Sequence, residues 1–175
     1  MNEKAKTYPP ELVKGLAMRY ALAREAGAIV KAAGETIRFL APDEEGRESK
    51  LQKNQLDNVV AVAVEAECIE VITNFIRYQI GRREAWRYKD FGLRVIKDIE
   101  EEQGPVVQAA ERVAAEVADR LREAEYEADE KELCREAHLE LTRLYLGYLT
   151  RCFVYGDATG NWDDFHKVRE VCQDV

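Results

Sequence analysis

The sequence predicts an all-α fold, a single-domain bundle of five or six helices. Apolar residues recur at helical spacing along most of the chain, and only 4 prolines and 10 glycines interrupt its 175 residues. A content of 46% hydrophobic and 34% charged residues is typical of a helical protein that is not membrane-bound. A chain of this length buries one core and is short for two, so we expect one domain over 1–175. Within it we expect a polar lead over 1–10 and a flexible loop over 41–49.

The first helix begins at Leu12 and its apolar pattern continues to Leu40. Two glycines, Gly27 and Gly34, lie inside this stretch. Each costs a helix about 1 kcal/mol relative to alanine, so we expect them to mark a close packing contact or a break.

The second helix is predicted to begin at Asn54, because Asn54 followed by Asp57 resembles an amino-terminal cap. Its apolar face consists of Leu56, Val59, Val60, Ala63 and Val64. The pattern resets near Cys68, and a third helix follows up to Gly81. The β-branched content of 59–72 raises a strand as the alternative, but the spacing of three and four favours a helix.

A fourth helix is predicted over 82–99. With each residue placed 100° further around the axis from Arg83, one line carries Arg87, Asp90, Arg94 and Lys97. The opposite side carries Tyr88, Val95, Ile96 and Ile99, with Trp86 at the edge. This arrangement predicts a basic stripe that faces outward, interrupted by one aspartate.

The last third of the chain predicts two long helices and a short one. Gly104 and Pro105 break the chain, and the helices are expected over 105–130, 131–155 and 161–173. Asn161 is expected to cap the last of them.

The segment from Asn74 to Lys97 is the strongest functional signal. It carries seven basic residues and only Glu84 and Asp90 as acids, whereas the whole chain has a net charge of -8. Like charges on a short segment repel one another unless an anion lies opposite. Two anions remain open: the chain's own acids, in a run from Asp98 to Glu102 and over 111–132, or an outside polyanion such as nucleic acid.

The aromatic residues of this segment also allow two interpretations. Tyr78, Trp86, Tyr88 and Phe91 alternate with arginines that suit phosphate oxygens, and their rings can stack on unpaired bases. Aromatic residues at helical spacing are also typical of a core.

Other functional classes find little support in the sequence. There is no glycine-rich nucleotide loop and no nucleophile elbow, so we expect no enzymatic activity and no cofactor. Metal ligands would come from Cys134 with His138 or Asp163 with His166, which is too few for a di-iron bundle site, and we expect no metal. Scattered cysteines and the absence of a long apolar run predict a cytoplasmic protein without membrane contact.

Two stretches resemble the small helical subunit of type III CRISPR effector complexes. They are Leu51-Gln52-Lys53-Asn54-Gln55-Leu56-Asp57-Asn58 and Val71-Ile72-Thr73-Asn74-Phe75-Ile76-Arg77-Tyr78-Gln79-Ile80-Gly81-Arg82. The family has a Lys/Thr-x-x-Gln-Leu/Ile-Arg-Asn type of helix start before a helix with basic residues. The resemblance covers about residues 50–97. Asp57 stands where the family tends to have a basic residue, and the acidic carboxy-terminal half is longer than a small subunit needs.

The resemblance implies a non-catalytic subunit of an RNA-guided ribonucleoprotein in antiviral defence. Its partners would be guide RNA, target nucleic acid and other effector-complex subunits. Lys53, Asn54, Gln55 and Asn58 would line a helix start, and the nucleic-acid-binding residues would be Lys53, Asn54, Arg77, Arg82, Arg83, Arg87, Lys89 and Arg94. The alternative is a helical scaffold protein whose basic stripe docks on an acidic partner or drives self-association.

Overall fold

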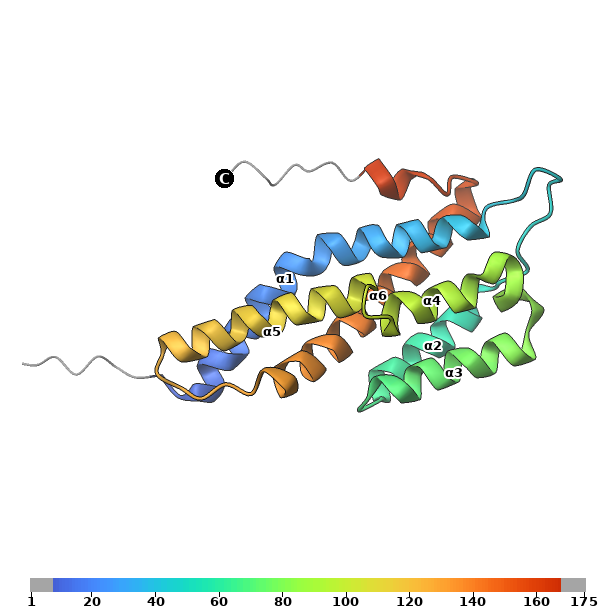
Figure 1. The fold of residues 1–175 in the computed structure, drawn as a ribbon. Coiled ribbons are helices and arrows are strands. Elements are labelled where there is room, and N and C mark those ends of the chain that lie inside the picture. The colour runs from blue at the N-terminus through green and yellow to red at the C-terminus, as the bar shows by residue number, and fades with distance from the viewer. Residues whose placement is uncertain (1–7, 168–175) are drawn as a thin grey trace, which may run out of the picture.

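The computed structural model describes residues 8–167, and every regular element in this range is a helix (Figure 1). The elements are α1 (Pro10–Ile37), η1 (Arg38–Leu40), α2 (Lys53–Glu65), α3 (Ile69–Arg82), η2 (Glu84–Asp90), α4 (Phe91–Glu100), α5 (Pro105–Glu123), α6 (Glu130–Thr159) and η3 (Asp164–Lys167), where η marks a short 3-10 helix. The predicted all-α bundle is therefore confirmed. None of the helices in 8–167 is long and apolar enough to cross a lipid bilayer.

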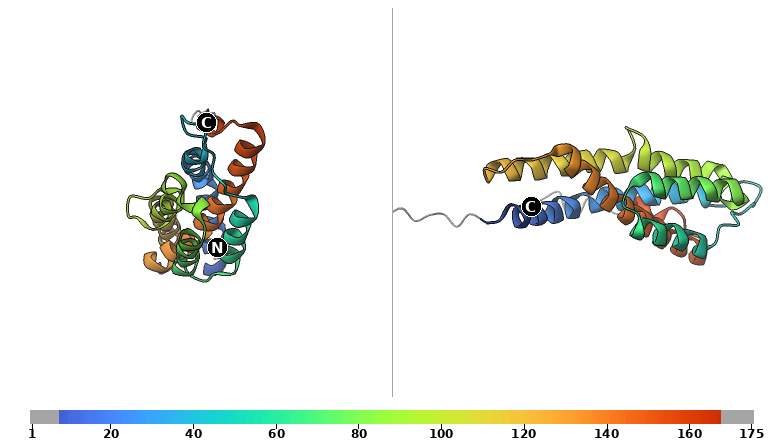
Figure 2. Two further views of the ribbon diagram at one scale, coloured as in Figure 1. Left: turned by 90° about the vertical axis from the view of Figure 1, so that its right-hand side faces the viewer. Right: turned by 90° about the horizontal axis from the view of Figure 1, so that it is seen from below.

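Three long helices, α1, α5 and α6, pack along one another and form the body of an elongated molecule (Figures 1 and 2). α5 buries a face made almost entirely of alanine and valine, including Ala109, Val113 and Val117. Short side chains at a helix contact allow the axes to approach closely. α6 supplies larger side chains to the same core, among them Leu141 and Tyr145.

The α2–α3 hairpin and α4 complete the bundle, with α2 against α6 and α4 against α3 and α5 (Figure 1). Arg143 of α6 forms hydrogen bonds to the carboxy-terminal end of α2. Its Nε donates to the Ala63 carbonyl at 2.9 Å and its Nη2 donates to the Ala66 carbonyl at 2.8 Å. The last carbonyls of a helix lack partners within the helix and carry partial negative charge, so a guanidinium stabilises this end of α2.

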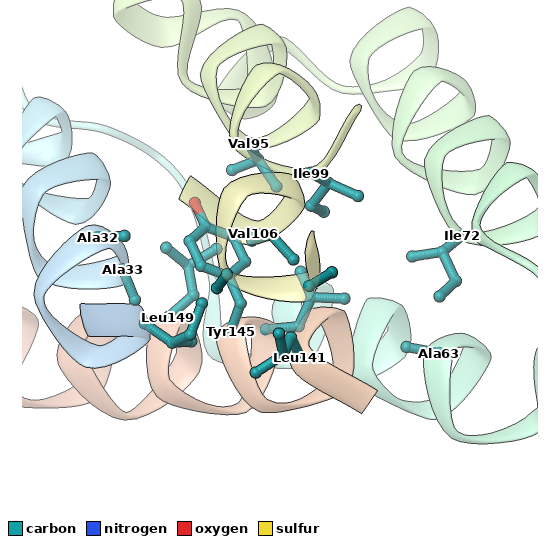
Figure 3. Close-up of a cluster of buried hydrophobic side chains, with 14 of the residues drawn as sticks. Ala32, Ala33, Ala63, Ile72, Val95, Ile99, Val106, Leu141, Tyr145 and Leu149 are labelled. Atoms are coloured by element: carbon teal, nitrogen blue, oxygen red, sulfur yellow. The ribbon is translucent and has the colours of Figure 1, made fainter. Parts of the chain in front are cut away.

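The core lies where α4, α5 and α6 meet (Figure 3). Val95 and Ile99 of α4 and Val106 of α5 pack on Leu141 and Tyr145 of α6, and all five are fully buried. Burying a side chain of this size contributes about 1.5–3 kcal/mol. The same cluster anchors α4 to the body of the bundle, and α4 in turn positions η2, which directly precedes it in the chain.

Several predicted boundaries are wrong. α2 begins at Lys53 with Gln52 at the cap position and no side-chain cap, so Asn54 is not the cap. Burial of Leu51 just before the helix holds the chain at this point. Val64 was expected on the apolar face of α2 but is 63% exposed.

The acidic helix α5 ends at Glu123, earlier than expected, because Glu125 takes a left-handed backbone conformation with φ +64°. Asp129 then caps α6, with its Oδ1 accepting from the amides of Lys131 and Glu132. α6 continues past the predicted stop at Gly156 and ends at Thr159, with Gly160 at the cap position.

Two glycines are sites of close contact. A Cβ on Gly34 would collide with Phe165, and a Cβ on Gly156 would collide with the Trp162 ring, so the chain after α6 folds back onto α1 and α6. Gly34 thus marks a packing contact, as predicted, whereas a Cβ on Gly27 would meet no neighbour. The helix expected over 161–173 is the short η3, and its last residues lie outside the described range.

The segment 41–49 has no helix, as expected. Its turn is organised by Asp43, whose Oδ1 accepts from the amides of Glu45 at 3.0 Å and Arg47 at 2.8 Å. These bonds to the carboxylate, and the Arg47 side chain beside it, lower the pKa of Asp43.

Candidate nucleic-acid interface

The basic segment does not form the single helix that was predicted over 82–99. It follows the end of α3, then η2, and then the first turns of α4. The break lies at Tyr88, which is extended, and at Lys89 and Asp90, which have φ values of 45° and 59°. The predicted line from Arg83 through Arg87 to Lys97 therefore does not exist as one helical stripe.

The break turns two aromatic rings inward. Trp86 and Phe91 are both 0% exposed, and their ring centroids lie 5.6 Å apart. The prediction of base stacking is wrong for these two residues, and the alternative of a core role is correct. The prediction misplaced Trp86 because it assumed one α-helix over 82–99, whereas Arg83 is extended and Trp86 lies in the 3-10 helix η2.

The two tyrosines behave differently. Tyr78 on α3 is 50% exposed, with its ring 6.0 Å from that of Phe75. Tyr88 is half-buried, and its hydroxyl donates to the Arg47 carbonyl at 2.8 Å. Among the four predicted aromatic residues, Tyr78 is the most exposed, and the Arg82 guanidinium lies over its ring, 5.8 Å from the ring centre.

Arg77 is neutralised within the fold. Its Nη2 donates to Glu100 Oε2 at 2.5 Å and its Nη1 donates to Glu100 Oε1 at 3.1 Å, a two-pronged ion pair. This pairing lowers the pKa of Glu100 and raises that of Arg77. The chain's own acidic run therefore supplies the counter-ion here, one of the two alternatives that the sequence left open.

The predicted residues on α2 are also weak candidates. Lys53 pairs with Asp57 at 2.6 Å, one helical turn away. Asn54 and Asn58 are exposed, but Gln55 is buried and cannot contact an outside ligand.

Three other predicted cations bind backbone oxygens. Arg87 Nη1 donates to the Ile80 carbonyl at 2.8 Å, Lys89 Nζ donates to the Ala41 carbonyl at 2.7 Å, and Arg94 Nε donates to the Lys89 carbonyl at 3.2 Å. A carbonyl carries only a partial charge, so it positions a cation without cancelling its unit charge. Arg87 thus closes the end of α3 and keeps its positive charge.

Arg94 is nevertheless less available to an outside anion than Arg87 and Lys89. Its guanidinium lies 3.6 Å from the centre of the Phe39 ring. It also lies near the carboxylate of Asp98, where burial raises the pKa and the charge of Arg94 opposes part of that rise. We therefore leave Arg94 out of the candidate interface.

Arg82 and Arg83 end α3 and are exposed. Arg82 Nη1 donates to the Tyr78 hydroxyl at 2.6 Å, a neutral partner. The Arg83 side chain forms no hydrogen bond or ion pair with the part of the chain that the structure describes. We call the set Arg82, Arg83, Arg87 and Lys89 the basic tip.

A shallow groove of about 340 Å³ borders the basic tip. Lys50, Arg87 and Tyr88 line it together with the acids Glu48 and Glu84. Within 8–167, neither of these acids forms an ion pair with a residue of the basic tip. The tip therefore keeps its positive charge beside two exposed carboxylates that lower, but do not cancel, the local potential.

The rest of the acidic half does not reach the basic tip. Its glutamates pair with arginines of the body: Glu116 with Arg24, Glu123 with Arg120, Glu130 with Arg122 and Glu132 with Arg135.

Asp98 was expected among the acids that could form ion pairs with the arginines. It is instead half-buried and accepts hydrogen bonds from hydroxyl groups inside the bundle. Its Oδ2 accepts from the Thr36 hydroxyl at 2.5 Å and from the Tyr145 hydroxyl at 2.6 Å. Burial raises the pKa of Asp98 above its ordinary value, and burial also raises the pKa of Tyr145. The sequence gives no signal for this cluster, because its three residues come from α1, α4 and α6.

The weak metal hypothesis gains no support. The residues that the structure describes contain no group of three or more His, Cys, Asp or Glu placed to hold a metal ion. His138 Nε2 lies 2.7 Å from the Ile99 carbonyl. Burial raises the pKa of the Cys134 thiol, which disfavours the thiolate form that binds metals. The side chain of His166 lies outside the described residues.

Comparison of the chain with protein-family models, with curated proteins and with solved structures gives no match.

Proposed function

We propose that this protein is a non-enzymatic helical subunit that contacts the phosphate backbone of a nucleic acid through the basic tip. The observation that carries the proposal is the charge state of Arg82, Arg83, Arg87 and Lys89. Their partners in 8–167 are a hydroxyl, backbone carbonyls or none, whereas Arg77 and Lys53 bind carboxylates. In a chain of net charge -8, such a surface is an unusual concentration of available positive charge.

The chemistry fits phosphate better than bases. A guanidinium offers several N–H donors in one plane, which suits the oxygens of a phosphate. The carbonyl of Ile80 at the end of α3 holds the Arg87 side chain in position, and the other N–H groups of its guanidinium can still donate to a phosphate. Binding therefore costs this side chain little conformational entropy. With Trp86 and Phe91 buried, few ring faces remain for reading or stacking bases. The expected binding is therefore independent of sequence.

The affinity of the isolated chain should be low. Net charge -8 repels a polyanion at long range, while the tip attracts it within a Debye length of about 8–10 Å. Stable binding then depends on neighbouring subunits that hold the nucleic acid close. This behaviour suits a component of a larger ribonucleoprotein.

The finer proposal follows the resemblance to the small subunit of type III CRISPR complexes. The resembling stretches cover the start of α2 and all but the first two residues of α3, and α3 ends at the basic tip. On this proposal the tip would contact the backbone of the guide RNA or its target, and the other surfaces would contact further effector subunits.

The test compares two double variants in fluorescence anisotropy with labelled single-stranded RNA and DNA over a salt series. R82A together with R83A removes two charges of the tip. Each phosphate contact to a single strand contributes about 0.7 to the slope of log K against log salt, so the slope should become shallower by about 1.4. R120A together with R135A removes the same charge from residues outside the basic tip and should leave the slope unchanged.

If the tip variant and wild type have the same affinity and the same salt slope, the tip is not a phosphate site. Thermal melting of each variant by circular dichroism checks that the fold is intact. Arg87 is left unchanged in this test because its loss would also unfasten the end of α3.

A helical interaction protein is the second candidate. It is favoured by the burial of Trp86 and Phe91, which leaves a charged surface with little that is specific to nucleic acid. In that case the tip docks on an acidic protein surface. Wild type would then show no nucleic-acid binding, together with self-association that high salt abolishes and that R82A with R83A weakens.

A further inference from the structure

The amino-terminal half of α1 exposes large apolar side chains along one line. Leu12, Leu16 and Tyr20 are 46%, 46% and 66% exposed. They lie four residues apart, so they share one face of the helix, and exposed Ala23 continues the line. We call these four residues the α1 stripe.

The α1 stripe borders a groove of about 870 Å³. The start of α1 lies at the end of the molecule opposite the end of α3, which carries the basic tip (Figure 1). Val13, Ala17, Arg24 and Arg120 also line this groove. Single exposed apolar residues are common on protein surfaces, but a contiguous apolar surface beside a groove is typical of an interaction site.

The charged residues next to the α1 stripe indicate which kind of partner it can bind. Lys14 pairs with Glu136 at 2.5 Å, Arg24 pairs with Glu116, and Glu25 accepts from Arg112. These three residues of α1 are therefore neutralised by the helices that pack on it.

Glu11 and Arg19 are the exceptions on this half of α1. Both are exposed, and neither forms an ion pair or hydrogen bond with a residue in 8–167. They lie eight positions apart, on a line beside the stripe, with Gly15 midway between them. A Cβ on Gly15 would meet nothing within 4 Å, so the backbone there is open to a close approach.

This pattern is self-complementary. If a second copy of α1 lies antiparallel across the first and the two cross near Gly15, Glu11 of each copy comes opposite Arg19 of the other. The stripe follows this line by one residue, about 100° around the helix, so the apolar side chains of the two stripes then meet along one side of these ion pairs. A two-fold interface has this property, because the same surface is used on both subunits and every contact occurs twice.

We propose that the α1 stripe is the interface of a two-fold symmetric homodimer, with antiparallel α1 helices crossing near Gly15 and reciprocal Glu11–Arg19 ion pairs. A second copy fits better than a small apolar molecule, which would leave both charges unpaired. The inference concerns a different surface from the basic tip and does not depend on the proposed nucleic-acid contact.

A charge-exchange experiment tests the pairing. The dimer dissociation constant of the full chain is measured by sedimentation velocity over a wide range of protein concentration. E11R alone and R19E alone place like charges opposite each other twice, and each should weaken the dimer by about tenfold or more, which is 1.4 kcal/mol. E11R with R19E together should restore it towards wild type. Restoration is the distinctive result, because the two residues are too far apart on one helix to pair within a single copy.

The apolar part has its own variant and a matched control. L16E should abolish dimerisation without unfolding the chain, since Leu16 is already half-exposed. L93E changes a leucine of nearly equal exposure, 48%, on α4 and should leave the dimer intact.

Three outcomes would overturn the proposal. A wild-type chain that stays monomeric at all concentrations excludes the homodimer and leaves the groove to another occupant. A dimer that L16E and the charge variants do not affect lies on another surface, such as the basic tip. A dimer that dissociates when residues 1–7 are deleted, while L16E has no effect, would assign the contact to that segment.

Discussion

The two ends of this molecule use charged and apolar residues in opposite ways. At the basic tip the large rings of Trp86 and Phe91 are buried while the cations remain exposed and uncompensated. At the start of α1 most charges are paired with neighbouring helices, while Leu12, Leu16 and Tyr20 remain exposed. One end is suited to an anion and the other to an apolar surface. Net composition hides this difference, because both ends contribute to the same averages.

The difference has a local cause. The tip is built from short, irregular pieces that are fastened by side-chain bonds to backbone carbonyls, as with Arg87 and Lys89. The α1 end is one regular helix whose buried face is lined by small residues such as Ala17 and Ala21. In an irregular segment, polar side chains satisfy backbone carbonyls that no helix pairs. In a regular helix the backbone groups pair with one another, so the side chains on the outer face are not needed for this purpose.

The largest expected effect contrasts burial at the two ends. W86A should lower the free energy of unfolding by about 3–5 kcal/mol, because it leaves a large cavity beneath the tip. L16A should change it by less than about 0.5 kcal/mol in the monomer, as is usual for surface substitutions. Chemical denaturation at low protein concentration measures both. A loss under about 1 kcal/mol for W86A would contradict the burial of this ring.

A pair of glycines should respond with opposite signs. In G92A the new Cβ would lie 2.5 Å from Ile80 Cγ1 and 3.0 Å from the Trp86 carbonyl oxygen, so the packing of α4 must shift. We expect a loss of about 1–3 kcal/mol. G15A adds a methyl group in open space within a helix and should stabilise the monomer by about 0.5–1 kcal/mol. If both variants stabilise the protein in thermal melts, α4 does not pack on Ile80 as described.

The junction between the two ends should show a pH dependence through Asp98. Burial raises its pKa in the folded state above the ordinary 3.8, so the folded protein holds this proton more tightly than the unfolded chain does. Stability contributed by Asp98 should therefore increase as pH falls through the raised pKa, and level off below 3.8. The groups that face it are Thr36, Tyr145, Glu35 and Arg94.

D98N removes this titration and leaves the other groups in place. The difference in unfolding free energy, wild type minus D98N, should become more favourable to wild type between neutral pH and about pH 4, by about 1.4 kcal/mol for each unit of pKa difference. Denaturant unfolding at a series of pH values measures it. A difference that is constant with pH, or that moves the other way, would show that Asp98 is not destabilised by burial.

The smallest expected effect separates paired from unpaired arginines. R77A should cost about 0.5–1 kcal/mol, because it breaks the half-exposed ion pair with Glu100, and the cost should shrink in high salt. R83A should leave stability unchanged and lower only nucleic-acid affinity. Equal stability losses for the two would mean that Arg83 also has a partner in the fold.

Helical spacing was sufficient to predict the all-α class and the start of α3 near Ile69. It could not predict the break at Lys89 and Asp90, because neither residue is a glycine or a proline, the residues that usually mark a left-handed backbone or the end of a helix. The positions after Asp90 are rotated by this break, whereas Trp86 was misplaced because it lies in the 3-10 helix η2 after the extended Arg83 and not in an α-helix.

The candidate site was predicted in part. Arg82, Arg83, Arg87 and Lys89 were expected from charge alone, and they do form an exposed cluster. The ion pair between Arg77 and Glu100 forms because α3 and α4 lie side by side. This tertiary arrangement cannot be predicted from helical spacing. The sequence predicts the α1 stripe only as part of a helix, because Leu12 and Leu16 do not differ in the sequence from residues that face a core.

The length of α1 limits what a two-fold assembly of this protein could hold. A helix of 28 residues extends for about 42 Å, and pairing at its start would send the two basic tips to opposite extremes of the assembly. A short oligonucleotide could then occupy one tip at a time, whereas a long strand, or two separate ones, could be bridged. Avidity should therefore appear only above a threshold of ligand length.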